Sequence, residues 1–467
     1  MVFPRALAGL CGLMLALSGC AAILPPGPPA EPRLPLPPAE ETLVLPPMKQ
    51  FTVAYPLAPQ RSNTEIGRDY LDLMFRLETG ETLPVLSRFE GPITVTVAGG
   101  PRGATLDPDL DRLLRRLRRE GGIDIRRVPD GQTASITIVP VSEAELRRTV
   151  PSAACFVVPA RVTWAEFRRR SRQAELDWRR QRVRQAATVF IPGDASPQEI
   201  RDCLHEEIAQ ALGPLNDLYR LEDSVFNDDN LHSVLTGFDM LVLKITYDPA
   251  LQSGMTRDQV AARLPAVLAR QNPQGEGLPT RPFQPTPRAW INDVERALGP
   301  SRSNQSQAAT RALTRARQEG WNDTRLGLSY MAAARVAADR VDPVALDYYL
   351  RAAEVYDARP ATRIHAAHAA VQLAAFALAA EQWQTALNIA DEYIPAAIRG
   401  ENAALLADLY LVQATALSAQ GRTREAEAAR RDSLAWGQYG FGSPALLRGR
   451  AAEITSLGPA DAEGGQG

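Results

Sequence analysis

The spacing of apolar residues divides the chain into a region of alternating helices and strands and a later region of helices alone. In the first region, short apolar or alternating segments predict strands at 91–100, 123–129, 134–141, 154–159 and 186–193. Amphipathic spacing predicts helices at 64–77 and 106–122. A further helix is expected after Ser196, because Pro197 and Glu199 complete the pattern of a capping box with proline at the first helical position.

Beyond residue 287 the composition changes to Ala, Leu, Arg and Gln with few β-branched residues, which predicts helices. Three helical pairs can be superimposed there, and their matching alanines are Ala345, Ala386 and Ala426, spaced by 41 and 40 residues. A period near 40 with small residues at the crossings indicates a solenoid of helical hairpins and resembles the tetratricopeptide repeat. An ordinary alanine-rich bundle is the alternative.

The 467 residues are too many for one hydrophobic core, so we expect two or three domains. The patterns assign a signal peptide, an anchor with a proline-rich spacer, a mixed α/β domain, a second proline-rich linker with a short helix, helical repeats and a disordered tail; the residues are 1–19, 20–60, 61–270, 271–300, 301–456 and 457–467. The net charge of −2 gives no general attraction to nucleic acid, and no nucleic-acid partner is expected.

The first twenty residues have the pattern of an export signal. Arg5 precedes an apolar run that is too short to cross a membrane and that ends at Cys20. The segment Leu17-Ser18-Gly19-Cys20 resembles the lipobox of bacterial lipoproteins, which implies cleavage before Cys20 and a lipid on that cysteine. The resemblance implies a membrane anchor and a periplasm-facing body, and Ala21 favours the outer membrane. The alternative is a buried helix that ends in a cysteine.

Ten prolines lie between residues 25 and 47, and such a segment favours an extended polyproline II spacer. After removal of Cys11 with the signal peptide and lipidation of Cys20, two cysteines are left. In an oxidising compartment we expect Cys155 and Cys203 to form a disulfide, which would join a strand to the helix after Ser196. Two unpaired buried thiols are the alternative.

The segment "CLHEEIAQALGPLND", residues 203–217, resembles the zinc-binding helix of metzincin proteases, HExxHxxGxxH. The register that matches keeps the glutamate as Glu207 and the glycine as Gly213. The three ligand positions then hold Glu206, Gln210 and Asn216, with Asp217 beside the last. At 100° per residue Glu206, Glu207 and Gln210 share one side of a helix, and His205 points away from them.

The downstream sequence extends the resemblance. Ser224-Val225-Phe226-Asn227 resembles the Met-turn below a metzincin site, with Phe226 in the place of methionine, and 236–249 resembles the helix that follows. The pattern "CxxEExxQALGxxND … SxFND" is similar to a family of proteobacterial lipoproteins of unknown function with a degenerate zincin domain. The expected fold is therefore an α+β zincin-like (metzincin-like) domain followed by an all-α, tetratricopeptide-like helical-hairpin solenoid.

These residues are a poor set for zinc, because an amide is a weak ligand and no imidazole is present. Ca²⁺ or Mg²⁺ prefers oxygen ligands, and Glu206, Gln210, Asn216 and Asp217 would supply part of such a shell. We expect a metal-free polar network instead, with Glu207 and Gln210 hydrogen-bonded in the cleft, and no cofactor. Carboxylates buried without a cation need partners or raised pKa values.

Two other groups of residues are candidates for a functional role. Eight arginines between Arg168 and Arg184 suit anionic lipid headgroups or a protein, and a solvated helix face with pairs to Glu175 and Asp177 is the favoured interpretation. His365 and His368 are expected to pack or lie on the surface rather than bind metal. His232 is the histidine that can fold back to the cleft.

Both halves predict binding of an unidentified envelope protein or peptide without catalysis, since helical repeats and zincin clefts both present peptide-binding surfaces. An assembly factor or scaffold is the first hypothesis. The alternative is an unusual metal-dependent peptidase in which Glu207 is the general base and Glu206, Gln210 and Asn216 or Asp217 hold the metal.

Overall fold

The computed structural model describes residues 45–54, 56–151, 153–170 and 173–458. The predicted signal peptide, the lipidation site Cys20, the first part of the spacer and most of the predicted tail lie outside the described residues. Among the helices that the structure describes, none has both the length and the apolar character needed to span a membrane.

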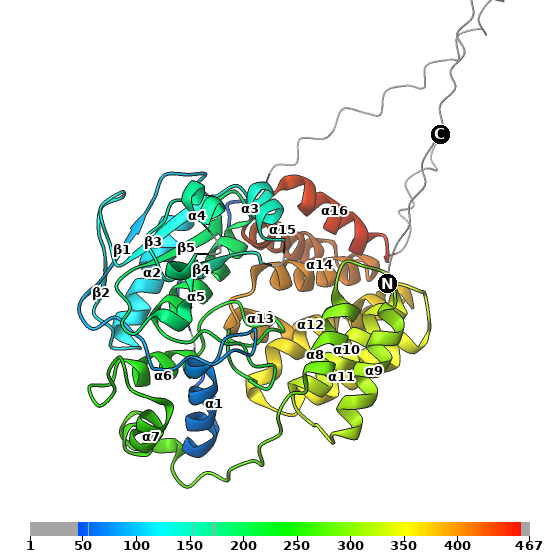
Figure 1. Cartoon of the computed structure of the whole chain (residues 1–467). Helices are drawn as coiled ribbons and strands as arrows, with labels where there is room; N and C mark the ends of the chain where they lie inside the picture. Colours follow the sequence, from blue (N-terminus) through cyan, green and yellow to red (C-terminus); the bar gives the residue numbers. More distant parts are fainter. Residues whose placement is uncertain (1–44, 55, 152, 171–172, 459–467) are drawn as a thin grey trace, which may run out of the picture. The chain divides into compact units, whose positions relative to one another are not determined.

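One five-stranded sheet lies in the first half of the described chain (Figure 1). Its strands are β1 Ile93–Val97, β2 Ile125–Arg127, β3 Ile136–Val141, β4 Phe156–Val158 and β5 Ala187–Pro192, in the order β2-β1-β3-β5-β4. Neighbours are parallel except β4, which pairs antiparallel with β5 at the edge, with Val157 opposite Val189. Each strand lies inside one of the predicted strand segments, so those predictions are confirmed.

Seven helices belong to this half: α1 Asn63–Phe75, α2 Leu106–Arg119, α3 Glu143–Thr149, α4 Trp164–Arg170, α5 Pro197–Leu212, α6 Gly237–Thr246 and α7 Arg257–Gln271. Helices α2 and α5 cover one face of the sheet and share its main apolar core. On the other face, Phe156 and Phe190 pack against α4 through Trp164 and Phe167, with ring centroids 4.8–6.5 Å apart. Apolar residues on both faces explain why β5 is buried along its whole length.

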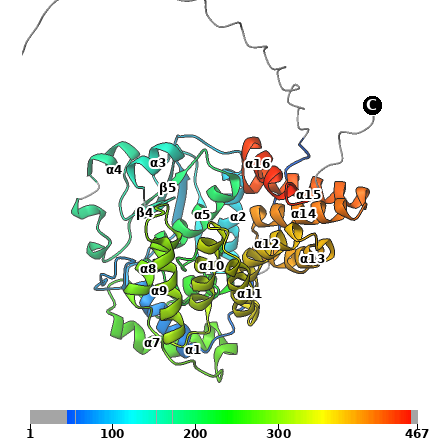
Figure 2. The same ribbon diagram turned by 90° about the vertical axis from the view of Figure 1, so that its right-hand side faces the viewer.

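The second half is all helical: α8 Arg288–Leu298, α9 Gln305–Gln318, α10 Thr324–Ala338, α11 Val344–Asp357, α12 Arg363–Ala379, α13 Trp383–Arg399, α14 Ala403–Ala419, α15 Thr423–Gly440 and α16 Pro444–Thr455. Successive helices pack against each other around a second core that is rich in alanine (Figure 2). The predicted crossing residues Ala345, Ala386 and Ala426 are all buried, each in the first turn of its helix, α11, α13 and α15. Small side chains at these positions let the helix axes approach closely.

The turns between the helices of the three hairpins recur at a fixed interval. Val341, Glu381 and Gly421 each adopt a left-handed conformation, with φ of 56°, 55° and 73°, and successive members are 40 residues apart. In each turn the next amide bonds back to the carbonyl five residues earlier, at 2.8–3.0 Å: Asp342 to Ala337, Gln382 to Ala377 and Arg422 to Leu417. This is the bond of a Schellman motif, so each hairpin closes in the same way.

The two halves are joined by buried hydrogen bonds. At the start of α5, the side-chain oxygen of Gln198 accepts from the amides of Ala403 and Ala404 at 2.7 and 3.0 Å, and so caps α14. At the end of α15, the hydroxyl of Tyr439 donates to Asp109 on α2 at 2.7 Å. Polar side chains of α2 and α5 therefore find hydrogen-bond partners on helices of the second half.

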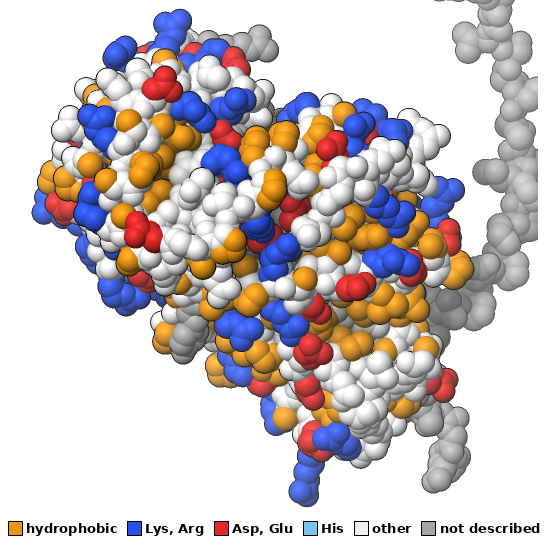
Figure 3. Space-filling model, turned by 90° about the horizontal axis from the view of Figure 1, so that it is seen from below, with side chains coloured by type: hydrophobic (Ala, Val, Ile, Leu, Met, Phe, Trp, Pro, Cys, Tyr) orange, Lys and Arg blue, Asp and Glu red, His pale blue; other side chains and the backbone are white. Residues whose placement is uncertain are grey.

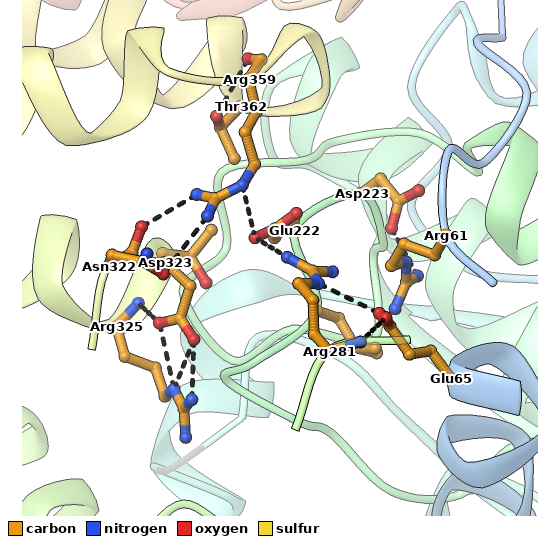
Figure 4. Close-up of polar contacts among 12 residues, drawn as sticks. Arg61, Glu65, Glu222, Asp223, Arg281, Asn322, Asp323, Arg325, Arg359 and Thr362 are labelled. Atoms are coloured by element: carbon orange, nitrogen blue, oxygen red, sulfur yellow. Dashed lines mark hydrogen bonds and ion pairs between the residues drawn. The ribbon is translucent and has the colours of Figure 1, made fainter. Parts of the chain in front are cut away.

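The predicted linker between the halves is fixed by ion pairs (Figure 4). Arg281 lies between two buried carboxylates, at 3.1 Å from Glu65 and 2.8 Å from Glu222. Arg359 approaches Glu222 from the helical half, at 3.3 Å. The extended segment that contains Arg281 is thus held to the α/β half, and Glu222 also pairs with the helical half.

The last part of the predicted spacer also lies against the folded chain. Phe51 stacks on Trp436 of α15, with ring centroids 4.5 Å apart, and its carbonyl accepts from Arg112 of α2. Lys49 forms an ion pair with Asp432 at 2.7 Å. The spacer predicted for 20–60 therefore ends in a segment that contacts both halves.

The hairpin turns generate a stability prediction. Val341 is 90% exposed and β-branched, so its left-handed conformation is strained and no packing compensates. We expect Val341→Gly to raise the free energy of unfolding by about 1 kcal/mol, measured by urea denaturation.

The matched control is Gly421→Val in the equivalent turn, where an added Cβ would meet no atom within 4 Å. It should lower stability by a similar amount, because only the backbone conformation penalises it. Equal stability of Val341→Gly and the unchanged chain would contradict the strain that we assign to this turn.

Candidate functional site

Helix α5 carries most of the residues selected from the sequence. Its first turn is capped by Ser196, whose hydroxyl accepts from the Glu199 amide at 3.2 Å, and Pro197 occupies the first turn as predicted. The predicted capping box is only partly formed. The Ser196 hydroxyl binds the Glu199 amide, but the Glu199 carboxylate does not bind back to the Ser196 amide and lies 3.8 Å from Arg147. Twelve of the sixteen residues of α5 are buried, so every polar side chain on it needs a partner.

In the structure, as predicted, Glu206, Glu207 and Gln210 lie on one side of α5 and His205 lies on another. Glu206, Glu207 and Gln210 line an open cleft of about 750 Å³. His205 is buried on another side of the helix, where its Nδ1 accepts from the Leu235 amide at 3.1 Å. The histidine of the "HEE" motif therefore has a structural partner and takes no part in the cleft.

The cleft collects residues from several separate parts of the α/β half and from the end of α15. Its carboxyl groups come from α5, from the turn after α1 and from the loops after α5: Glu78, Glu199, Asp202, Glu206, Glu207, Asp217 and Asp228. One wall is formed by Phe156 and Val157 of the edge strand β4 and by Cys155 just before it, and Gly440 contributes from α15. The predicted disulfide between Cys155 and Cys203 is present, with the Cα atoms 5.9 Å apart.

The disulfide joins the β4 wall to α5 one turn before Glu206 and Glu207. It therefore fixes the distance between the edge strand and the helix that carries the carboxyl groups. The alternative of two unpaired thiols is wrong.

Asn216 and Asp217, which the sequence left as alternatives, take different places. The Asn216 amide donates to the carbonyl of Asp72 at 3.1 Å, and its side chain does not line the cleft. Asp217 does line it. Of the two, Asp217 is therefore the residue that faces Glu206 and Glu207.

The segment that resembles a Met-turn forms a tight polar loop below the cleft. The Ser224 hydroxyl donates to Asp239, and the Val225 amide donates to the same carboxylate at 3.1 Å. Phe226 is fully buried, and Val225 lines the cleft floor. Asn227 donates to the carbonyl of Leu221 at 2.6 Å, which closes the loop.

The carboxyl groups of the cleft have strongly raised pKa values. Burial, followed by the negative charges of Glu78, Asp202 and Asp228, raises the pKa of Glu206 to about 8. Burial, followed by the negative charges of Glu206 and Glu78, raises the pKa values of Glu207 and Asp217 well above their usual range. Burial also raises the pKa of Asp202 to about 7, although Arg201 opposes the change.

The expected hydrogen-bonded network of Glu207 and Gln210 is incomplete in the described part of the chain. Glu207 is 3% exposed, and its Oε2 atom has no hydrogen-bond partner among the described residues. The same holds for Oδ1 of Asp217. The physical reason is that carboxylates surround both groups, so no donor is within reach and the raised pKa values take the place of a partner.

The donor set can be tested against a zinc ion, which the resemblance to zincins implies. Within the described chain, one group of three possible ligands lies close together, Cys155, Glu206 and Glu207, with ligand atoms within 4.8 Å of one another. Cys155 is in the disulfide, which leaves two carboxylates. Gln210 adds only an amide and no histidine of α5 faces the cleft, so these residues do not fit zinc.

Three histidines lie together at the boundary of the two halves, which the sequence did not indicate. His232 lines the cleft, and its ring centroid lies 5.1 Å from that of His365 on α12. The Nε2 atom of His365 lies 3.1 Å from the carboxylate of Asp229. Burial lowers the pKa values of His232 and His368 to about 4, so both rings are neutral at pH 7. No local signal reveals this cluster, because His232 and Asp229 are more than 130 residues from His365 and His368.

The arginine-rich segment also differs from the prediction. It is not one solvated helix: α4 ends at Arg170 and two short 3-10 turns, Ala174–Leu176 and Trp178–Arg180, follow. The local pairs with Glu175 and Asp177 are present. Arg184, however, is buried and donates to the carbonyls of Gln210 and Gly213 at the end of α5. A positive charge at a helix C-terminus is favourable, so this arginine positions α5.

Residues 63–266 match the model of a family described as "Protein of unknown function (DUF2927)". The match begins with α1, contains the whole sheet and the cleft residues of α5, and ends within α7. No curated protein and no solved structure matches the chain. The comparisons therefore relate residues 63–266 to one family model and assign no activity to them.

The raised pKa of Glu206 generates a prediction. Between pH 4.5 and about 8 the folded chain holds a proton that the unfolded chain releases, so this carboxyl lowers stability as the pH rises through that interval. In Glu206→Gln that effect is absent. One pKa unit corresponds to about 1.4 kcal/mol, and the cleft is open to water. We therefore expect the free energy of unfolding of Glu206→Gln to exceed that of the unchanged chain by about 1–2 kcal/mol at pH 9 and to equal it at pH 4.

The measurement is thermal or urea unfolding of both proteins at the two pH values. Glu427→Gln, an exposed position on α15, is the matched control and should leave the stability unchanged at both pH values. A gain for Glu206→Gln that is equal at pH 4 and pH 9 would show that burial of the amide, not titration of the carboxyl, is responsible.

Proposed function

We propose that this protein is a lipid-anchored protein of the bacterial envelope that binds an extended segment of another protein in the cleft beside α5, without catalysis. One observation carries the proposal: the edge strand β4 forms a wall of the cleft. Among the described residues β4 pairs only with β5, so its second edge offers backbone groups to a ligand. Extended peptides bind to such edges by adding a strand to the sheet.

The chain topology supports the resemblance to a zincin domain on which this proposal draws. Four parallel strands are followed in space by one antiparallel edge strand, and α5 follows β5 directly along the chain. In that arrangement the residues of the motif helix face the edge strand across the cleft. The binding mode that the resemblance implies, a peptide lying along the edge strand, therefore has a free edge and an adjacent cavity here.

The possible metal ligands of the cleft do not suit catalysis. Glu206, Gln210 and Asp217 offer carboxylate and amide oxygens, and an amide is a poor zinc ligand. Glu207 is surrounded by carboxyl groups that keep its pKa high, which does not suit a general base at neutral pH. The cleft is thus better suited to holding a ligand than to hydrolysing one.

The helical half supplies a second surface for proteins. The identical turns at 40-residue spacing and the buried alanines support the resemblance to tetratricopeptide repeats, whose stacked hairpins form extended binding surfaces. Its contribution of Gly440 to the cleft rim means that a ligand in the cleft also reaches α15.

The envelope location rests on two features. The disulfide between Cys155 and Cys203 is typical of an oxidising compartment. The lipobox-like residues 17–20 supply an anchor, although they lie outside the described residues. Together they support a periplasm-facing protein held to a membrane through Cys20.

The proposal is tested with the full-length chain in detergent and an unbiased library of extended peptides. We expect binders with dissociation constants in the micromolar range, about −8 kcal/mol. Hydrogen exchange should slow on binding at residues 153–158 and in α5. Glu207→Gln should leave every bound peptide intact, as the unchanged chain does.

Two results would overturn the proposal. Slower exchange confined to α8–α16 would place the ligand on the helical half. Cleavage of bound peptides that is lost in Glu207→Gln would establish the metal-dependent peptidase instead.

A further inference from the structure

The titratable side chains that line the cleft are acidic, apart from one histidine. Seven carboxyl-bearing residues line it, whereas neither lysine nor arginine is among the lining residues that the structure describes. His232 is the one other titratable side chain there, and it is neutral at pH 7. On the face shown in Figure 3, by contrast, basic and acidic side chains are interspersed. The cleft therefore differs in charge from the visible surface of the protein.

Several of these carboxyl groups have no cation of their own. Glu199 lies 3.8 Å from Arg147, and Asp202 lies 3.4 Å from Arg201. The exposed Glu78 and the more enclosed Glu206, Glu207 and Asp217 form no ion pair with any described residue. The unpartnered Oε2 atom of Glu207, in a side chain that is 3% exposed, faces this group. A buried oxygen without a donor is costly, so the group is open to a ligand that brings donors.

A long cationic side chain fits this site. An ammonium group has three donors and a guanidinium group has five, which suits several carboxylate oxygens that face one point. The apolar lining of the cleft includes Leu77, Val157, Trp178, Leu215 and Val225. The methylene stem of lysine or arginine packs on such apolar surface while its charged head reaches further.

We infer that the extended segment bound beside β4 carries a lysine or arginine whose cationic head enters the group formed by Glu78, Glu206, Glu207 and Asp217. The inference rests on the proposed function and adds the chemical class of the ligand. An arriving cation favours the ionised carboxyl groups, so binding releases protons. Affinity therefore increases between pH 6 and pH 9, in the interval in which Glu206 ionises and lysine stays charged.

The test uses the full-length chain in detergent and three synthetic eight-residue peptides, in which threonine alternates with lysine, glutamine or glutamate. We expect the lysine peptide to bind about tenfold more tightly than the glutamine peptide, and the glutamate peptide more weakly still. Calorimetry in two buffers of different ionisation enthalpy should detect proton release for the lysine peptide alone.

Glu207→Gln combined with Asp217→Asn should abolish the preference for lysine. The matched control is Glu354→Gln combined with Glu427→Gln, two exposed positions on α11 and α15, which replaces the same number of carboxyl groups by amides and should keep the preference. If the first variant does not fold, the comparison of the three peptides on the unchanged chain decides on its own.

Equal affinity for the lysine and glutamine peptides, with slower exchange at 153–158, would overturn the inference and leave the proposed function in place. Failure of these peptides and of the unbiased library would overturn both. Tight binding of Ca²⁺, Mg²⁺ or Zn²⁺ that displaces the lysine peptide would overturn the inference in another way, because a metal ion would then be the cation of the site.

Discussion

The burial of helix α5 is the constraint on which the rest of the structure depends. A helix that carries Gln198, Arg201, His205, Glu206 and Glu207 can be enclosed only if each polar group meets a partner. Gln198 caps α14, Arg201 donates to the carbonyl of Glu401, and His205 accepts from a backbone amide. Glu206 and Glu207 are the exception, since they face a cleft of other carboxyl groups.

This arrangement explains why the two halves form one compact unit. The helical half supplies the partners for one side of α5, and Arg201 lies between the rings of Phe51 and Tyr439, with its guanidinium 5.3 Å from each centroid. Without α14 and α15, a fully buried arginine and a buried glutamine would lose their partners. The α/β half is therefore not a self-sufficient domain in its polar bonding, although its apolar core is separate.

Local rules were sufficient for the strands, for the start of α5 and for the side of it that bears Glu206, Glu207 and Gln210. Each depends on residues within a few positions of one another. The disulfide followed from the count of cysteines and the expected compartment. Glu78 and Asp228 were missed as cleft residues, because only the folding of distant loops brings them to α5.

The error about the arginine-rich segment has the same origin. Arg184 is one of many arginines in its sequence, and nothing near it indicates that the end of α5 lies opposite. The histidines are a similar case: His232 and His365 were read as unrelated residues, and the packing of the two halves places their rings in contact. Long-range contacts of polar residues are not encoded in local periodicity, whereas the position of apolar faces is.

The segment from Leu45 to Ser62 has a mechanical consequence. Lys49 and Phe51 hold it to α15, and the Phe51 carbonyl holds it to α2, before the chain enters α1. A pulling force applied through the amino-terminal end would therefore load these contacts first and reach the sheet only after they had broken. Their rupture would remove a ring from beside Arg201 and loosen the junction next to α5, so tension at the amino-terminal end would be transmitted to the helix that carries Glu206 and Glu207.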